Sequence, residues 1–325
     1  MDNVNQTLLT ELILVGFTQN FQACILLFVM FFIMYILTIL GNSFLIFTII
    51  VSPQLHTPMY YFLCNLSFID LGYTSCSIPK ILLDSFSNAR TISVTGCLIQ
   101  MNFGLFLGTT ECILLAVMAY DRYIAICFPL HYTVIMSWKV CNCITIVMWS
   151  GSFIGTLIPN IIKPLVFCRR NQLNHISCEI LAVLELACGD LTITKMHMFY
   201  QSAVFLISPL LFIIVSYICI IISILKISSV GGRSKAFSTC ASHLTVVIMF
   251  YGTSMVMYMG QARFSSSQKY ISLVYGVGTP VLNPFIYSLR NNDVKEAFMK
   301  KFLIHIGHQF SNCVATETID LSEAS

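Results

Sequence analysis

The sequence predicts an all-α fold: a seven-transmembrane helix bundle, followed by a short amphipathic helix on the membrane surface. Of the 325 residues, 57% are hydrophobic and only 10% are charged, whereas about a quarter of the residues in an ordinary soluble domain are charged. Seven segments are also apolar over the roughly 20 residues that a helix needs to cross the hydrocarbon core. A soluble globular enzyme is therefore excluded, and the low charge excludes a disordered chain.

The N-terminal segment, residues 1–22, is predicted to be extracellular. Its start lacks a basic region followed by a short apolar region and a cleavage site, so we expect no cleaved signal peptide and a first span that serves as its own anchor. Asn5-Gln6-Thr7 is a glycosylation sequon, which makes Asn5 a predicted glycosylation site if this end faces the lumen.

The seven predicted spans form a bundle over residues 23–290. The first span contains no charged residue. The seventh contains Pro280 and Pro284, which are tolerated in a membrane because neighbouring helices re-satisfy the freed carbonyl groups. The predicted spans are 23–50, 58–81, 97–120, 140–162, 197–225, 236–259 and 270–289.

Residues 291–325 are predicted to be a cytoplasmic helix and tail. Between 292 and 304, apolar side chains such as Val294, Phe298 and Phe302 recur at helical spacing beside Lys295 and Lys301. This pattern is typical of a helix that lies in the membrane interface.

An outside N-terminus follows from the distribution of charge and cysteine. With seven spans it places Lys226, Arg233 and Arg290 inside, as the positive-inside tendency requires, although Arg90 and Arg169 then lie outside and the bias is modest. The same orientation brings four cysteines to the oxidising side, where disulfides form. These cysteines are Cys97, Cys168, Cys178 and Cys188.

Two acidic residues lie deep inside predicted spans, where charge is costly and is by default a functional hypothesis. At about 1.5 Å per residue from the cytoplasmic ends, Asp70 and Glu111 both lie about 16 to 18 Å deep, and Asn42 and Asn283 lie at about 15 and 10 Å. Hard oxygen ligands suit a small cation, so a sodium or proton site at Asp70 and Glu111 is one interpretation. The alternative is that each acid is protonated and hydrogen-bonded.

Other chemistries find no support in the sequence. It contains no G-x-S-x-G, H-E-x-x-H, Walker loop or dinucleotide-binding glycine motif, so we expect no enzyme and no cofactor. The net charge of +3 comes without a dense basic run, so nucleic-acid binding is not expected.

Several motifs occur in order along the chain. They are LHTPMYYFLCNLSFID (55–70), MAYDRYIAIC and PLHY (118–132), SPLLFIIVSY (208–217), KAFSTCASHL (235–244) and PVLNPFIYSLRN (280–291). Together the motifs resemble the olfactory (odorant) receptors, a branch of the rhodopsin-like G-protein-coupled receptors, nearly from end to end.

The resemblance implies residue roles that the spacing alone does not give. Arg122 would be the arginine that faces the G protein when the cytoplasmic ends spread, with Asp121 restraining it and Tyr217 and Tyr287 closing around it in the active state. The same switch would include Tyr123, Asn283 and Pro284. The resemblance also favours Cys97–Cys178 and Cys168–Cys188 disulfides, with Cys97–Cys188 as the alternative.

The resemblance further implies partners and location. It predicts an odorant receptor that activates a stimulatory, olfactory-type heterotrimeric G protein and raises cyclic AMP, in the plasma membrane of sensory cilia, with trafficking chaperones as further partners. The alternatives are a non-olfactory chemosensory receptor of the same fold, or a transporter or channel. The latter would need a continuous polar path, whereas the outer half is largely apolar.

A ligand pocket is expected between the helices, in the outer half of the bundle. No carboxylate lies in the outer half of the third span, and an unpaired ammonium would be penalised there, so small neutral volatile ligands are favoured. Tyr258, Ser254 and Gln201 are candidates for the orienting hydrogen bond. The predicted lining consists of Met101, Leu105, Gly108, Thr109, Cys112, Gln201, Ser202, Phe205, Tyr251, Ser254, Met255 and Tyr258.

Overall fold

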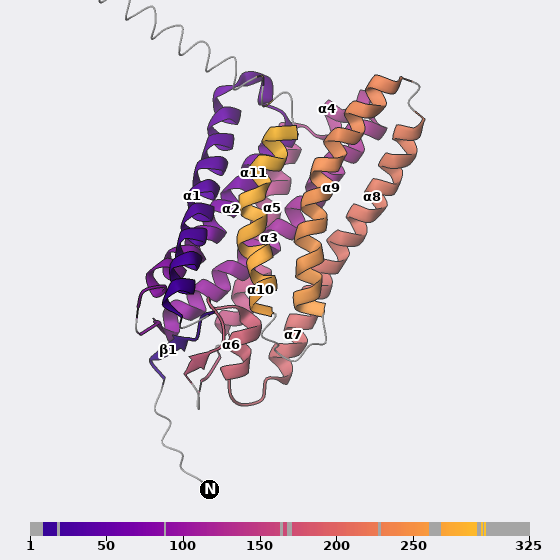
Figure 1. Ribbon diagram of the computed structural model, residues 1–325. Helices are drawn as coiled ribbons and strands as arrows, with labels where there is room; N and C mark the ends of the chain where they lie inside the picture. Colours follow the sequence, from indigo (N-terminus) through magenta and orange to yellow (C-terminus); the bar gives the residue numbers. More distant parts are fainter. Residues whose placement is uncertain are drawn as a thin grey trace, which may run out of the picture.

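Long helices running roughly side by side make up most of the structure, a computed structural model (Figure 1). It describes residues 9–17, 20–87, 89–162, 165–167, 171–226, 229–259, 268–290, 294 and 296. The helices are α1 (Phe21–Val51), α2 (Pro58–Asp84), α3 (Val94–Cys127), α4 (Tyr132–Ile135), α5 (Trp138–Ile162), α6 (Ile180–Leu186), α7 (Thr192–Ser202), α8 (Ser208–Leu225), α9 (Val230–Met259), α10 (Gln268–Leu273) and α11 (Thr279–Arg290).

Two of the predicted spans are built from consecutive helices. The π-helical segment η3 (Ala203–Ile207) joins α7 to α8, and the π-helical segment η4 (Val274–Gly278) joins α10 to α11. Each of the seven predicted ranges falls on a helix or on one of these joined pairs. Single π-helical turns inside longer helices often mark functional positions, and both of these reach the cavities described below.

Local sequence explains where several helices begin. Asn20 caps α1, since its side-chain oxygen accepts hydrogen bonds from the backbone N–H groups of Gln22 and Ala23 at 3.0 and 3.3 Å. Pro58 opens α2, where its missing N–H costs no hydrogen bond. The Ser93 hydroxyl accepts from the Gly96 N–H at 3.0 Å and caps α3.

Five helical stretches are long and apolar enough to cross a membrane: α1, α3, α5, the joined α7–α8 and the 240–258 part of α9. The helix α2 is not among them, and it carries Asn65, Asp70, Lys80 and Asp84. This helix packs between α1 and α3, so it is polar where other protein, rather than lipid, surrounds it. The all-α bundle that the sequence predicts is confirmed.

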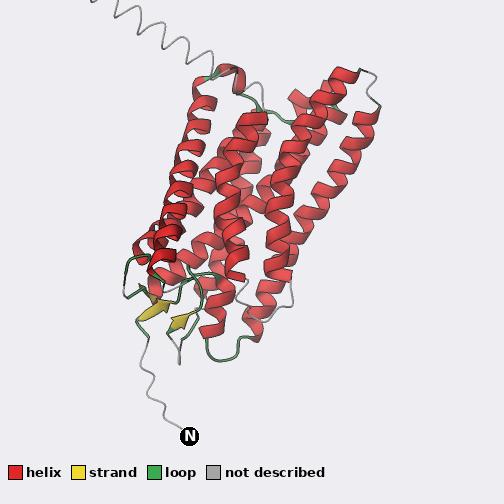
Figure 2. Ribbon diagram, in the orientation of Figure 1, coloured by secondary structure: helices red, strands yellow, loops and turns green. Residues whose placement is uncertain are grey.

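A small three-stranded sheet covers one end of the bundle and was not predicted. Strand β1 (Glu11–Leu14) lies in the middle, antiparallel to β2 (Thr91–Ser93) and parallel to β3 (Gln172–Leu173). Figure 2 shows strands at this end of the bundle. Leu12 and Leu14 are buried beneath it. We call this end of the bundle the sheet end. The opposite end, which carries α4 and the end of α3, is the Arg122 end.

The core is centred on α3, which packs against α2, α5, α8 and α9. Its buried side chains include Leu107, Leu114 and Leu115, which join one apolar cluster with residues of α2, α8 and α9. The predicted amphipathic helix over 292–304 lies almost wholly outside the described residues, of which only Val294, which is buried, and Glu296 belong to it.

Candidate functional site

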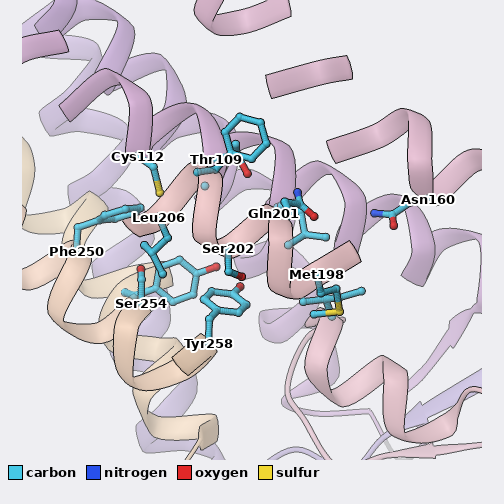
Figure 3. A pocket seen from close by; sticks show the side chains of 16 residues that line it. Thr109, Cys112, Asn160, Met198, Gln201, Ser202, Leu206, Phe250, Ser254 and Tyr258 are labelled. Carbon is cyan, nitrogen blue, oxygen red and sulfur yellow. The ribbon is translucent and has the colours of Figure 1, made fainter. Parts of the chain in front are cut away.

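A cavity lies in the half of the bundle nearer the sheet end. Side chains of α3, α7, η3 and α9 converge on it, and Asn160 of α5 lies at the far side from Phe250 and Ser254 (Figure 3). Nine of the predicted lining residues are found there: Leu105, Gly108, Thr109, Cys112, Gln201, Ser202, Phe205, Ser254 and Tyr258.

Three predicted residues lie outside the lining of this cavity. The Tyr251 hydroxyl is turned toward α3 and donates a hydrogen bond to the Cys112 carbonyl oxygen at 2.8 Å. Tyr251 and Met255 instead line an apolar groove between α8 and α9. Met101 lines an adjoining chamber. Helical spacing identifies the face of a helix only to within one neighbouring position, which explains these differences.

The prediction missed seven lining residues. Gly104 and Phe250 stand four positions before Gly108 and Ser254, so helical spacing could have found them. Ile180 and Tyr275 come from segments that the prediction did not place at the cavity. The full set of missed residues is Gly104, Asn160, Ile180, Met198, Leu206, Phe250 and Tyr275.

The adjoining chamber is more polar and lies closer to the sheet end. It shares Gly104, Leu105, Ile180, Tyr258 and Tyr275 with the first cavity. The residues that belong to it alone include Tyr73, Ser77, Gln100, Ser272 and the carboxylate of Glu179.

Glu179 was not predicted, because it lies in the segment between α5 and α7 rather than in a span. Its Oε2 accepts from the Leu181 N–H at 2.8 Å and its Oε1 accepts from the Tyr258 hydroxyl at 3.2 Å. Burial raises the pKa of Glu179 to about 7, against the opposing effect of these hydrogen bonds. One signal could have found it, since it directly follows Cys178, a predicted disulfide cysteine.

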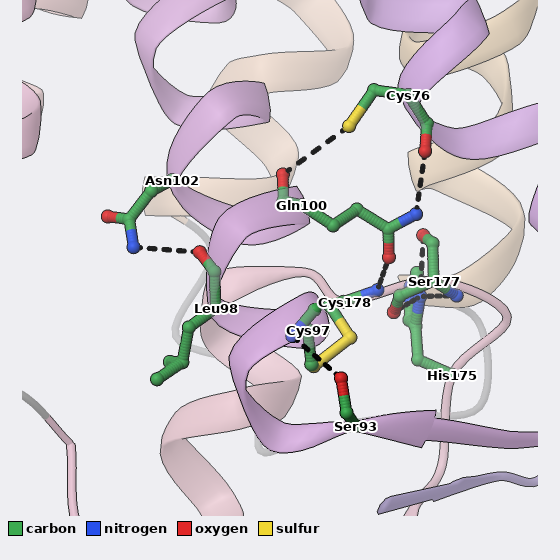
Figure 4. The surroundings of a disulfide bond; sticks show 10 residues. Cys76, Ser93, Cys97, Leu98, Gln100, Asn102, His175, Ser177 and Cys178 are labelled. Atoms are coloured by element: carbon green, nitrogen blue, oxygen red, sulfur yellow. Dashed lines mark hydrogen bonds between the residues drawn. A yellow bond between two sulfur atoms is a disulfide. The ribbon is translucent and has the colours of Figure 1, made fainter.

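A disulfide between Cys97 and Cys178 fixes this segment to the start of α3, with Cα atoms 5.3 Å apart. Gln100 reinforces the bond, since its side chain donates to the Cys76 carbonyl and accepts from the Cys178 N–H, both at 2.9 Å (Figure 4). The alternative Cys97–Cys188 pair is therefore not formed. Cys188 is also disulfide-bonded, and Cys168, its expected partner, lies outside the described residues, as does Asn5.

His175 links the segment that follows β3 to α10. Its Nδ1 lies 2.9 Å from the Ser177 carbonyl oxygen and its Nε2 lies 3.1 Å from the Ser272 hydroxyl of α10. Burial lowers the pKa of His175 to about 4, and the positive charge of Lys269 contributes to the shift. The ring is therefore neutral at pH 7 and acts as a hydrogen-bonding link between the loop and α10.

The deep acids lie in the centre of the bundle, but only part of the predicted four-residue cluster is hydrogen-bonded. The Asn283 amide donates to both carboxylate oxygens of Asp70, at 3.1 and 3.0 Å. Glu111 is buried and its Oε1 has no hydrogen-bond partner within the described structure. Asn42 donates instead to the carbonyl oxygens of Thr38 and Pro280. No group of three metal-ligating side chains occurs among the described residues.

At the Arg122 end, Asp121 holds two partners. Its Oδ2 lies 3.8 Å from the Arg122 guanidinium, and its Oδ1 accepts from the Tyr132 hydroxyl at 2.7 Å. Burial and the charge of Asp121 raise the pKa of Tyr132, so its phenol stays a hydrogen-bond donor. Tyr132, on α4, is the last residue of the PLHY motif, and the predicted switch did not include it.

Among the described hydrogen bonds, those of Tyr217 go to α9 and not to Arg122. Its hydroxyl lies 2.8 Å from Nδ1 of His243 on α9, and the two rings are stacked 5.7 Å apart. The other ring nitrogen of His243 lies 3.1 Å from the Leu115 carbonyl oxygen, so one imidazole joins α3, α8 and α9. The Tyr287 hydroxyl and one Arg122 nitrogen are buried without a hydrogen-bond partner in the described part of the chain.

Comparison with known proteins agrees with the motifs. A family model described as olfactory receptor matches residues 31–305. Olfactory receptor 13C9 of Homo sapiens is 49% identical over 306 residues, which cover 91% of this chain and 96% of the relative. Olfactory receptor 13C2 of Homo sapiens has the same identity and coverage. Olfactory receptor 2A7 of Mus musculus is 43% identical over 299 residues, which cover 91% of this chain and 96% of the relative.

Proposed function

From the premise that the chain belongs to the olfactory receptor family, we propose that small, mostly neutral volatile molecules bind in the cavity between α3, α7 and α9. The family consists of multi-pass membrane receptors for odorants that act through G proteins, and it is not a class of enzymes. The observation that carries the proposal is the cavity itself. Its wall is mostly apolar, with Thr109, Ser202, Ser254 and Tyr258 adding hydroxyl groups. Such a chamber is typical of small-molecule sites in helical bundles.

Within the cavity, hydroxyl groups near Tyr258 orient the ligand while apolar side chains surround the rest of it. Met198 and Phe205 are adaptable walls that repack around different shapes. Ser254 and Gln201 serve as further hydrogen-bond partners. The ligand shifts the receptor only by binding the active arrangement more tightly than the inactive one.

The signal passes from the cavity to the Arg122 end through α3 and α9. Tyr251 connects the two helices below the cavity through its bond to Cys112. In the resting arrangement, Asp121 restrains Arg122, and the Tyr217 hydroxyl is hydrogen-bonded to His243. An outward swing of α9 breaks the His243 links, so that Tyr217 and Tyr287 turn to Arg122 and a stimulatory, olfactory-type G protein binds and raises cyclic AMP.

The sheet end faces outward in this proposal. The Cys97–Cys178 disulfide supports this orientation, because such bonds persist on the oxidising side of the membrane. Asn5 is then available for glycosylation, and the receptor works in the plasma membrane of sensory cilia with the help of trafficking chaperones. The same orientation places Asp121, Tyr123 and the Asn283-Pro284 pair toward the cytoplasmic half.

The test is a cyclic AMP assay in cells that co-express the chain and an olfactory stimulatory G protein. A panel of neutral and charged volatile compounds is applied, and surface expression is verified. We expect neutral compounds to raise cyclic AMP, and the response to vanish in Arg122→Ala at equal surface level. A surface-expressed receptor that stays silent to the whole panel would contradict the proposed ligand class and coupling.

A transporter or channel is the rival function. It predicts ion flux that survives both Arg122→Ala and loss of the G protein. The polar groups of the bundle centre, Asp70 with Asn283 and then Glu111, end at the largely apolar wall of the cavity, which favours the receptor.

A further inference from the structure

The chamber next to the odorant cavity holds a carboxylate for which the proposed function has no use. Glu179 lines this chamber and keeps part of its surface open, while Oε2 is anchored by the Leu181 N–H. Its partners in the described structure are hydrogen-bond donors, with no cation among them. The groups that donate to it are neutral, namely the Tyr258 hydroxyl and backbone N–H groups at the start of α6, so its negative charge has no counter-charge among the described residues.

Aromatic rings surround the same carboxylate. Tyr73 of α2, Tyr258 of α9 and Tyr275 of η4 line the chamber together with Glu179. The Tyr73 hydroxyl donates to the Tyr275 hydroxyl, and the Tyr258 hydroxyl donates to Glu179. Tyrosine rings attract cations through their π-faces, and a carboxylate among them adds a full opposite charge.

No positive side chain competes for this place. The described lining of the chamber contains no Lys, Arg or His. Lys269 of α10 is engaged with the Gly16 carbonyl oxygen at 3.0 Å, and His175 is held by Ser177 and Ser272. From α3, the chamber is faced by Gln100 and Met101, which carry no charge.

We propose that this chamber is an amine subsite: Glu179 pairs with the ammonium group of a ligand among Tyr73, Tyr258 and Tyr275, while the apolar tail of that ligand lies in the adjoining odorant cavity. The shared wall residues, Leu105 and Tyr258 among them, place the two parts of such a ligand side by side. The inference rests on the proposed function, and it adds volatile alkyl amines to the neutral ligands already proposed.

Direct binding tests the subsite without signalling. Hexylamine and hexanol share one tail and differ in the head group, and the melting temperature of the purified, full-length receptor is measured with each. We expect hexylamine to raise the melting temperature of the receptor. The variant Glu179→Gln keeps the size of the side chain, and it should weaken hexylamine binding about tenfold or more because a charge-assisted hydrogen bond is lost. Hexanol binding should change less than about threefold, since a neutral head needs no counter-charge.

The matched control is Glu185→Gln, which removes one negative charge from the same segment at an exposed position. It should leave hexylamine binding unchanged. Equal weakening by the two variants, or equal binding of hexylamine to wild type and to Glu179→Gln, would overturn the amine subsite. So would a wild-type receptor that hexanol stabilises and hexylamine does not.

The pH dependence provides a measurement that needs no variant. Since the pKa of Glu179 is about 7, its ionised fraction rises about tenfold between about pH 6 and about pH 8. Hexylamine should bind correspondingly more tightly at the higher pH, and hexanol should not. A flat or inverted hexylamine profile overturns the inference.

The amine subsite and the proposed function can fail separately. A cyclic AMP response to hexanol without amine binding would leave the proposed function standing, whereas amine binding without any signalling would contradict only the proposed function.

Discussion

Glu111 illustrates at the residue scale how a buried polar group points to function. Its Oε1 is buried without a hydrogen-bond partner in the described structure. The neighbouring acid, Asp70, accepts hydrogen bonds from the Asn283 amide at both carboxylate oxygens. Two carboxylates in a low-dielectric interior repel each other unless a proton or a cation compensates them. The sodium or proton site at Asp70 and Glu111 stays a prediction, which the following variants test.

Removing either negative charge should therefore remove the response to sodium. We expect Asp70→Asn and Glu111→Gln to change basal cyclic AMP about twofold or more and to abolish its dependence on external sodium, because each loses a hard oxygen anion. Asp84→Asn, which changes an acid paired with Lys80 near the sheet end, is the control. If both deep variants behave like wild type, the acids serve only in packing.

His175 gives a pH dependence with a definite sign. Its pKa is about 4 in the fold and about 6.5 in the unfolded chain, so between these values only the unfolded chain takes up the proton. Stability is complete above about pH 6.5 and falls as the pH drops, by about 3 kcal/mol in all. Thermal unfolding of the purified receptor should show this loss, and His175→Gln should flatten the curve. The exposed His131→Gln should leave it unchanged; identical curves for both variants would contradict this origin.

At the scale of elements, the contact between α5 and η3 shapes the odorant cavity. Gly155 of α5 lies against the ring of Phe205, a cavity residue, so that a Cβ at position 155 would stand 2.7 Å from the ring Cζ. Gly151, one helical turn earlier, has open space at the same place. The glycine at 155 thus allows η3 to approach α5 closely enough to bring Phe205 to the cavity wall.

Gly155→Ala should therefore change ligand recognition without touching the ligand. The added methyl group pushes the Phe205 ring away from α5 and alters the cavity, so we expect odorant potency in the cyclic AMP assay to fall about tenfold, since a misfit of this kind costs about 1–3 kcal/mol. Gly151→Ala makes the same change of helix propensity and should leave potency unaltered. Equal potencies for both variants would show that the ring moves without consequence.

At the scale of the whole molecule, three helices are joined through one side chain, and in the proposed mechanism this contact belongs to the resting state. His243 bonds to Tyr217 of α8 and to the Leu115 carbonyl of α3. An apolar groove also lies between α8 and α9, and the Tyr217 hydroxyl adds a second polar link there, to the Cys240 carbonyl oxygen of α9 at 3.4 Å. The proposed outward movement of α9 would break the bonds of His243.

His243→Phe should raise basal activity. It removes two hydrogen bonds of about 1 kcal/mol each from the resting state, which shifts the equilibrium toward the active state by about 30-fold. The measurement is ligand-free cyclic AMP at matched surface expression. Thr245→Val is the control, because the Thr245 hydroxyl bonds only within its own helix, to the Ala241 carbonyl. A silent His243→Phe would mean that the restraint lies elsewhere.

The sequence alone determined the class of fold, the family and most of the residues that line the cavity between α3, α7 and α9. Hydropathy and helical spacing are local properties, so seven apolar segments and the inward faces of α3 and α9 can be read from neighbouring residues. Leu105, Thr109 and Ser254 were found in this way, and the motif around Arg122 identified the family.

Only the tertiary structure decided what lies next to that cavity. Strand β1 pairs with β2 and β3 across long stretches of chain, and Glu179 reaches Tyr258 only because the Cys97–Cys178 disulfide fixes its segment against α3. Tyr251 turns toward Cys112 rather than into the cavity. Such outcomes depend on which distant side chains compete for one space, and no local pattern of residues contains that information.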